Sequence, residues 1–265
     1  MGEISIHAKK LTVLAKSIKP LPIVKYKDGV AYDSFEDPEL RYRQRYVDLI
    51  VNDGVKEKFL KRATVIKTMR AVLDEAGYTE VETPILQSIP GGASARPFIT
   101  HHNSLDMDLY LRIATELYLK RLIVGGFEGV YEIGKNFRNE GMDKNHNPEF
   151  TCMELYVQYK DYNWMMSFTE KLLERICIAV NGCTETEIDG KTISFKAPYR
   201  RLPILEAIKE KTGYDLEGKS EDEIRQVCKE LNMEIDDTMG KGKLIDEISV
   251  SYTHLRAHET GAYLV

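Results

Sequence analysis

The residues best suited to chemistry lie in residues 137–155, with the sequence FRNEGMDKNHNPEFTCMEL. This stretch combines an arginine, acids, a histidine and an aromatic ring, and it holds no obvious nucleophile or cage of metal ligands. A planar, always charged guanidinium suits a phosphate, and an aromatic ring can stack on a nucleobase. A partly buried carboxylate beside a tyrosine hydroxyl suits an ammonium group. The chemistry therefore depends on how the local elements bring these side chains together.

Two strands are expected to position this stretch, near residues 129–138 and 149–158. Side chains alternate between the two faces of a strand, so on the first strand Glu132 and Arg138 share a face. The second strand has one face of Met, Leu and Val, which fits a core. Its other face, which could meet a ligand, carries Phe150, Cys152, Glu154 and Tyr156.

If the strands pair through the loop at 139–148, Arg138, Glu154 and Tyr156 project from one surface. Aromatic, cationic and acidic groups then converge on a face that could hold a charged ligand. A hairpin with an ordinary salt-bridged face is the alternative interpretation, because charge on one strand face is usually just solvated. The rim of the surface carries Glu140, His146 and Asn147.

The remaining elements follow from apolar spacing and turn residues. Apolar side chains recur at spacings of three and four residues through residues 55–76, and the pattern ends at Gly77, which predicts a helix. A second helix is expected over 113–124, where Glu116 and Lys120 lie four apart. Between them, the loop PGGASARPF contains glycines that let backbone approach a ligand closely. Further expected elements are a strand in YTEVETPIL ended by Pro84, helices near 162–180, 203–211 and 220–231, and a hairpin turning at Asp189-Gly190.

Composition indicates a globular protein. The chain has 265 residues, 43% of them hydrophobic, and a net charge of −5, which argues against wholesale coating of nucleic acid. Its four cysteines form no C-x-x-C pair, and the N-terminus does not read as a signal peptide. No apolar run approaches the roughly 18 residues of a membrane helix. We therefore expect a cytoplasmic protein without a membrane span.

Two segments near the N-terminus are expected to carry no site. Alternating apolar residues predict a strand within residues 4–13, followed by a linker that reaches Pro20 and Pro22. The segment DPELRYRQRYVDLI is rich in arginine, which could meet phosphates. Arginines on a solvated connecting segment are the commoner case, so no site is assigned to Arg41, Arg43 and Arg45.

The motifs now described resemble the class II aminoacyl-tRNA synthetases and, within them, the lysyl-tRNA synthetase family. FRNEG followed by HNPEFT and MEL is similar to motif 2 of that family, and GYTEVETP after its helix is similar to motif 1, the dimer-interface motif. The long stretch from IPGGASARPF to GKNFRNEG also resembles these enzymes. The resemblance runs from about residue 2 to residue 249, and it implies an α+β fold with an antiparallel sheet flanked by helices.

The resemblance also implies roles for individual residues. Arg138 resembles the motif 2 arginine that holds the α-phosphate of ATP and the amino-acid carboxylate. Phe150 resembles the ring that stacks on adenine, and the loop residues that contact ATP correspond to Glu140, His146 and Asn147. The residues that resemble the lysine pocket are Gly92, Glu116, Glu154 and Tyr156.

The implied reaction explains the missing nucleophile. The carboxylate of lysine attacks the α-phosphate of ATP and pyrophosphate leaves, so the protein mainly positions reactants and neutralises charge. Mg²⁺ would bridge the phosphates, and the lysyl group would pass to tRNA(Lys). The motif 1 resemblance implies a homodimer. The G-x-x-x-x-G-K-[ST] pattern is absent from the sequence and is not expected in this family.

The resemblance predicts three segments. Residues 1–22 resemble the last part of an anticodon-binding OB-fold with its linker, and residues 23–249 resemble a partial catalytic domain. The family continues with metal ligands and motif 3, which residues 250–265 do not resemble. These residues instead resemble a translated transposase adapter of the kind used in sequencing libraries, so we expect an artefactual tail and an inactive chain. His254 and His258 have a zinc-ligand spacing, but we assign no metal to them.

Other functions remain open. A noncatalytic synthetase-like module that binds RNA or a partner is one alternative. A lysyl-synthetase paralogue that modifies a protein is another, although such paralogues lack the OB-fold that residues 1–22 resemble. Aspartyl- and asparaginyl-type enzymes share the architecture, but an anionic or amide substrate does not call for two glutamates beside a tyrosine.

Overall fold

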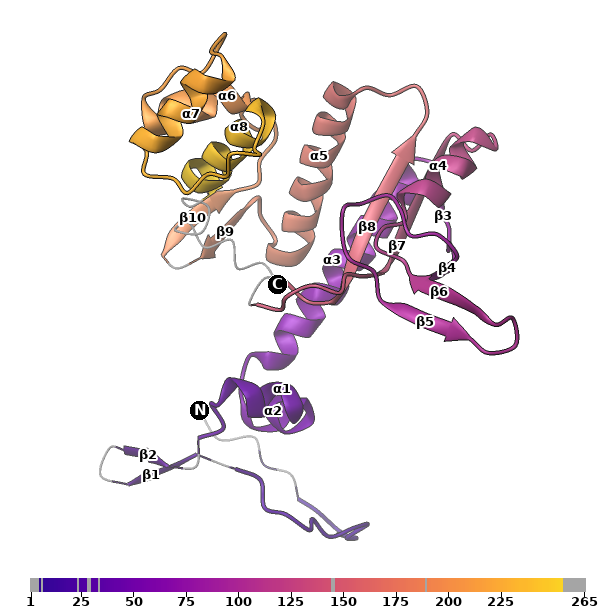
Figure 1. Ribbon diagram of the computed structural model, residues 1–265. Coiled ribbons are helices and arrows are strands. Elements are labelled where there is room, and N and C mark those ends of the chain that lie inside the picture. Colours follow the sequence, from indigo (N-terminus) through magenta and orange to yellow (C-terminus); the bar gives the residue numbers. More distant parts are fainter. Residues whose placement is uncertain are drawn as a thin grey trace. The chain divides into compact units, whose positions relative to one another are not determined.

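The computed structural model describes residues 5, 7–22, 24–27, 30–32, 34–143, 146–188 and 190–254. The chain divides into two compact units, residues 1–63 and residues 64–265, and each is described by itself. Figure 1 shows the course of the chain through its helices and strands.

The first unit contains a short hairpin and short helices. Strand β1 (Lys25–Lys27) pairs antiparallel with β2 (Val30–Tyr32). Helix α1 (Pro38–Arg43) begins where the Asp37 side chain accepts a hydrogen bond from the Leu40 amide, as an N-cap does. The remaining helices are α2 (Arg45–Val51) and α3 (Val55–Glu75), which starts in this unit and confirms the helix predicted over 55–76.

The strand predicted within residues 4–13 is wrong for the part of that segment that the structure describes. Residues 7–22 have no regular secondary structure, and the side chains of Leu11, Val13 and Leu14 are exposed. Alternation alone does not make a strand, because a strand needs a neighbouring strand and a buried face.

A buried carboxylate joins α1 to α2. Asp48 is fully buried, and its Oδ1 accepts hydrogen bonds from Asn52 Nδ2 at 2.7 Å and Arg41 Nε at 2.8 Å. Arg45 pairs with the other oxygen, and Arg43 pairs with Glu39. These arginines bind carboxylates of the chain itself. The hydrogen bond from Asn52, followed by those from the two arginines, lowers the pKa of Asp48.

The second unit is built on two small sheets (Figure 1). In the first sheet, β7 (Gly129–Phe137) lies between β3 (Thr79–Glu80) and β8 (Glu149–Val157), parallel to β3 and antiparallel to β8. The two long strands predicted around the 139–148 loop are confirmed. Strand β3 is shorter than expected because the Thr83 amide leaves the ladder and donates to Glu132.

The second sheet precedes this hairpin in the chain. Its order is β4 (Leu86–Gln87), β6 (Met107–Leu111) and β5 (Ile99–His102), with antiparallel pairing throughout. Helix α4 (Glu116–Val124) follows and begins three residues later than predicted. The delay has a physical cause, since the Thr115 amide donates to the Glu154 carboxylate. The mainly antiparallel sheets with helices confirm the expected α+β fold.

A helix covers the apolar face of the β7–β8 hairpin. Helix α5 (Tyr162–Asn181) begins at Asp161, whose side chain accepts from the Trp164 amide, and ends at Gly182 in the left-handed region. Its Leu172 and Ile176 pack with Val72 of α3 and with Met153 of β8. The Met, Leu and Val face of β8 therefore meets the core, as predicted.

An ion pair is buried against the other face of β7. Arg112 and Glu132 are 2% and 4% exposed, and the Arg112 guanidinium also donates to the backbone oxygens of Lys135 and Thr83, at 2.8 and 3.0 Å. Thr83 returns two bonds to the second Glu132 oxygen. A Cβ on Gly134 would lie 2.3 Å from an Arg112 nitrogen, so only glycine leaves room for this pair.

The C-terminal part of the unit is a helical cluster with its own core (Figure 1). It follows the hairpin of β9 (Glu185–Ile188) and β10 (Lys191–Ser194). The cluster contains α6 (Ile204–Thr212), α7 (Glu221–Glu230), α8 (Lys241–Ser249) and a π-helical turn at Val250–His254. Its core consists of Ile208, Leu216, Ile224, Val227, Cys228, Leu244 and Ile248.

Most predicted elements of this cluster are confirmed. The predicted helices at 203–211 and 220–231 correspond to α6 and α7, whereas α8 is an addition to the prediction. Residues 255–265, most of the expected artefactual tail, lie outside the described residues. Tyr252 is described, and its hydroxyl donates to the Leu231 oxygen at 2.8 Å. Among the described residues, helices long and apolar enough to cross a membrane are absent.

Glu132→Gln is expected to lower the free energy of unfolding by about 3 kcal/mol, because it leaves the buried Arg112 charge without its partner. Urea unfolding followed by Trp164 fluorescence measures this change. The exposed Glu128→Gln is the matched control. Combining Arg112→Met with Glu132→Leu should restore most of the loss. A single variant as stable as the control would show that the pair contributes nothing.

Asp48→Asn is expected to loosen α1 and α2 at neutral pH. The folded pKa of Asp48 lies below its ordinary value of 3.8, so its stabilisation is present above that value and disappears as pH falls through the folded pKa. Amide hydrogen exchange of residues 38–51 should therefore differ between variant and wild type at pH 7 and converge below pH 3.8. The exposed Asp53→Asn is the control, and a constant difference across pH would contradict the assignment.

Candidate functional site

The register of β7 and β8 creates one functional face. Glu132 lies opposite Glu154, and Asn136 lies opposite Phe150, while Val130 lies opposite Tyr156. The Arg138 amide donates to the Pro148 oxygen at 2.8 Å, which extends the ladder beyond β7. The prediction that the two strands present Phe, Glu and Tyr on one surface is confirmed.

Arginine and an aromatic ring occupy the loop end of this face. The guanidinium carbon of Arg138 lies 5.1 Å from the centre of the Phe150 ring. This distance is within the range of a cation–π contact. Arg138 has no ion pair with a carboxylate of the described residues, so its charge is available to a ligand.

Acid and hydroxyl groups occupy the other end of the face. The Tyr156 hydroxyl donates to Glu154 Oε2 at 3.2 Å, and the Thr115 amide donates to Oε1 at 3.3 Å. Burial raises the pKa of Tyr156, and the charges of Glu154 and Glu116 raise it further. The phenol therefore stays protonated as a donor, and the Glu154 carboxylate is fixed by two hydrogen bonds.

Glu116 lies at the same end, on the first turn of α4. Its Oε1 is 2.5 Å from the ammonium nitrogen of Lys120, one turn later on the helix. The same ammonium lies 5.9 Å from the centre of the Tyr156 ring. This second acid of the face is therefore already paired with an ammonium group of the chain.

Gly92 brings a loop against the start of α4. Its φ is +88°, in the left-handed region that favours glycine. A Cβ at this position would lie 3.1 Å from Glu116 Cβ and 3.2 Å from Ala114 Cβ. The glycine loop was predicted to approach a ligand closely. In the structure, Gly92 closely approaches Ala114 and Glu116 at the start of α4.

Three buried polar atoms around this face have no hydrogen-bond partner among the described residues. They are Thr115 Oγ1, Asn136 Oδ1 and Arg138 Nε. Nearly all buried polar atoms in folded proteins are satisfied by protein, water or a ligand. Asn136 lies opposite Phe150, and Thr115 contacts Glu154 through its amide, so these atoms flank the face.

The loop beyond β7 holds the other predicted residues. Glu140 accepts from the Arg96 amide at 3.3 Å, while His146 Nδ1 lies 2.8 Å from Asp143 Oδ2. Asn147 is exposed. Among the described residues, no contact joins His146 or Asn147 to Phe150. The other predicted residues lie at the two ends of the face, whereas His146 and Asn147 lie on the loop.

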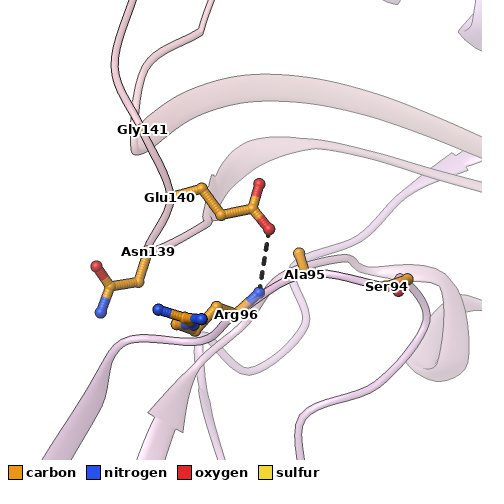
Figure 2. Close-up of a pocket in the computed structure, with 6 residues that line it drawn as sticks. All are labelled: Ser94, Ala95, Arg96, Asn139, Glu140 and Gly141. Carbon is orange, nitrogen blue, oxygen red and sulfur yellow. Dashed lines mark hydrogen bonds between the residues drawn. The ribbon is translucent and has the colours of Figure 1, made fainter. Parts of the chain in front are cut away.

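A cleft of about 540 Å³ opens between the glycine loop and the loop after β7 (Figure 2). Residues 94–96 form one wall and residues 139–141 form the other, and the dashed line in Figure 2 is the bond from the Arg96 amide to Glu140. Sequence reasoning placed the glycine loop near a ligand without singling out Arg96. It also missed Arg112, although a charged residue within the apolar run YLRIA is a signal of a buried ion pair.

The fold and the face together define a class of protein. The sequence profile of the family described as tRNA synthetases class II (D, K and N) matches residues 37–243. The chain therefore belongs to the class II tRNA synthetase family.

Similar proteins point to one branch of that family. The chain is 66% identical over 248 residues to a lysine–tRNA ligase of Porphyromonas gingivalis W83, which covers 94% of the chain and 43% of the relative. It is 64% identical over 247 residues to a lysine–tRNA ligase of Azobacteroides pseudotrichonymphae, covering 93% and 49%. Identity to the Christiangramia forsetii enzyme of the same name is 62% over 249 residues, covering 94% and 44%. The chain spans less than half the length of these relatives.

Gly92→Ala is expected to lower the free energy of unfolding by about 1–3 kcal/mol, because alanine at this φ is strained and its Cβ crowds Glu116. Thermal unfolding measures the change. Gly141→Ala is the matched control, since a Cβ there meets nothing within 4 Å and its φ is not positive. Equal effects of the two substitutions would show that the Gly92 contact is not constraining.

Proposed function

We propose that this chain carries the lysine- and ATP-binding face of a lysine–tRNA ligase, which activates lysine with ATP and transfers it to tRNA(Lys). The observation that carries the proposal is the division of one strand face into a cationic, aromatic end at Arg138 and Phe150 and an acidic end at Glu154 and Tyr156. The names of the relatives support the same function.

Charge favours lysine among the substrates of this family. The acidic end has two carboxylates, and Lys120 pairs with only one of them, Glu116. Glu154 receives neutral donors from Thr115 and Tyr156, and no cation of the described residues pairs with it, so an ammonium group of a ligand can do so. An aspartate side chain would be repelled there, and an asparagine side chain would leave the carboxylate without a cation.

At the other end, Arg138 would neutralise the α-phosphate of ATP and the carboxylate of lysine. Phe150 would stack on adenine, and Glu140, His146 and Asn147 would contact the nucleotide from the loop. Both reactants would then lie on one rigid hairpin, which lowers the entropy lost when the carboxylate attacks phosphorus and pyrophosphate departs. The positive charge of Arg138 would stabilise the negative charge that develops on the phosphate during this reaction.

Mg²⁺ is expected to accompany ATP. Among the described residues, groups of three or more His, Cys, Asp or Glu that could hold a metal ion are absent. We assign no protein ligand and no step of the reaction to the metal.

The proposed homodimer and the cytoplasmic location rest on family membership. Exposed apolar side chains just after the segment similar to motif 1 are consistent with a second copy covering them. They are Ile85, Leu86, Ile89 and Ile99.

Crossed substitutions test the two ends of the face in the 265-residue chain. Glu154→Gln should weaken lysine binding by about 10–100-fold, the effect of losing a charge-assisted hydrogen bond, and leave ATP binding unchanged. Arg138→Gln should weaken ATP binding by a similar factor. Isothermal titration calorimetry measures both ligands.

Glu149→Gln on the same strand is the control, because Glu149 is exposed and pairs with Lys135 on the outside. Lysine affinity that is unchanged in Glu154→Gln would remove Glu154 from the pocket. Absence of saturable binding of both ligands by the wild-type chain would count against the whole proposal.

A further inference from the structure

The guanidinium of Arg138 contains a buried donor without a partner. Its Nε and the Oδ1 of Asn136 are two of the three buried polar atoms that lack a hydrogen-bond partner among the described residues. The Nε group can only donate, and the amide oxygen can only accept. The third atom, Thr115 Oγ1, belongs to the residue that contacts Glu154 at the acidic end of the face. The two remaining atoms therefore complement each other.

The strand places Asn136 and Arg138 next to each other. They are two residues apart, and the bond from the Arg138 amide to the Pro148 oxygen continues the ladder past β7, so both side chains lie on one face. Phe150 lies directly opposite Asn136, and the Arg138 guanidinium carbon is 5.1 Å from the centre of the Phe150 ring. The guanidinium thus leans back along the strand toward Asn136.

Burial makes an unmatched donor and acceptor costly. Asn136 is 1% exposed, and a buried polar group without a partner loses its hydration without compensation. Nearly all such groups in folded proteins are bonded to protein or water. A rotation of the Asn136 amide, or one water between the two groups, satisfies both Oδ1 and Nε.

A neutral partner suits an arginine that binds an anion. Arg70, Arg112 and Arg175 each pair with a carboxylate of the chain, which compensates their charge. An amide oxygen can hold a guanidinium and leave its charge intact. When Nε is held in this way, the two terminal nitrogens form the fork that binds two oxygens of a phosphate.

We propose that Asn136 is the positioning residue of Arg138. Its Oδ1 accepts a hydrogen bond from Arg138 Nε, which orients the terminal nitrogens toward an anion on the face of Phe150. The inference rests on the proposed function, in which this anion is the α-phosphate of ATP. Asn136 does not touch the ligand and acts only through Arg138.

A double-mutant cycle in the 265-residue chain tests this role. Asn136→Ala should weaken ATP binding by about 3–10-fold, the cost of ordering one long side chain on binding. In the Arg138→Gln background the same substitution should have no further effect, because the side chain that Asn136 positions is gone. Isothermal titration calorimetry measures the four proteins. Gln87→Ala is the matched control and should leave ATP affinity unchanged, since Gln87 is a buried amide bonded to the Pro84 oxygen.

Asn136→Asp separates positioning from packing. The carboxylate has the shape of the amide and retains the acceptor, but it compensates the charge of Arg138. Positioning therefore predicts that ATP binding weakens by about 10–100-fold, as in Arg138→Gln and more than in Asn136→Ala. A role in packing alone predicts that the isosteric variant is the milder one. Thermal unfolding of each variant verifies that it is folded.

Nuclear magnetic resonance tests the hydrogen bond without a ligand. The Nε–H signal of Arg138, assigned by its loss in Arg138→Gln, should exchange with water more slowly than that of the exposed Arg121. This protection should disappear in Asn136→Ala and persist in Gln87→Ala.

Three results would each overturn the proposal. They are an Nε–H of Arg138 that is unprotected or indifferent to Asn136→Ala, additive effects of the two substitutions on ATP affinity, and a milder effect of Asn136→Asp than of Asn136→Ala. Additive effects would place Asn136 on the nucleotide itself. A protected Nε–H in a wild-type chain that does not bind ATP would instead oppose the proposed function.

Discussion

The candidate site depends on the buried ion pair between Arg112 and Glu132. Strand pairing places Glu132 directly opposite Glu154, so two carboxylates share one face. Like charges in this arrangement destabilise a sheet. Arg112 neutralises Glu132, and Thr83 satisfies the remaining oxygen. The negative charge opposite Glu154 is thereby compensated within the chain, so Glu154 can pair with a cationic ligand.

The same pair holds the surrounding segments in place. Arg112 lies between β6 and α4, Thr83 lies between β3 and β4, and Glu132 lies on β7. One guanidinium thus contacts residues at or near the ends of several short elements. Gly134 provides the space for it. Backbone bonds from Arg112 to Ile85 and from Phe137 to Arg112 complete this junction. The strands of the hairpin are therefore held by a polar junction on this face and by the apolar core on the opposite face.

The sequence predicted the parts of the fold that have a strong period. The length of α3, the two long strands and the assignment of faces in β8 follow from spacings of 3.6 and 2. The strand in residues 4–13 failed because alternation says nothing about whether a neighbour is present. The start of α4 and the short β3 were misjudged because Thr115 and Thr83 use their amides for glutamates far away in the chain. Arg96 and Arg112 were missed for a related reason. Whether an arginine pairs with a carboxylate, as Arg112 does and Arg96 does not among the described residues, depends on tertiary contacts.

The contact between Lys120 and Glu116 alters how an ammonium ligand would be held. An ammonium group that reaches Glu116 must displace one that is already there. The free energy gained at this carboxylate is then the difference between two similar contacts, so Glu116 adds little to affinity. Glu116 instead affects selectivity. A neutral or anionic group that displaced Lys120 would break the ion pair between Lys120 and Glu116 without forming a new one. Lys120 of helix α4 thus competes with any cation that binds to Glu116 at this end of the face.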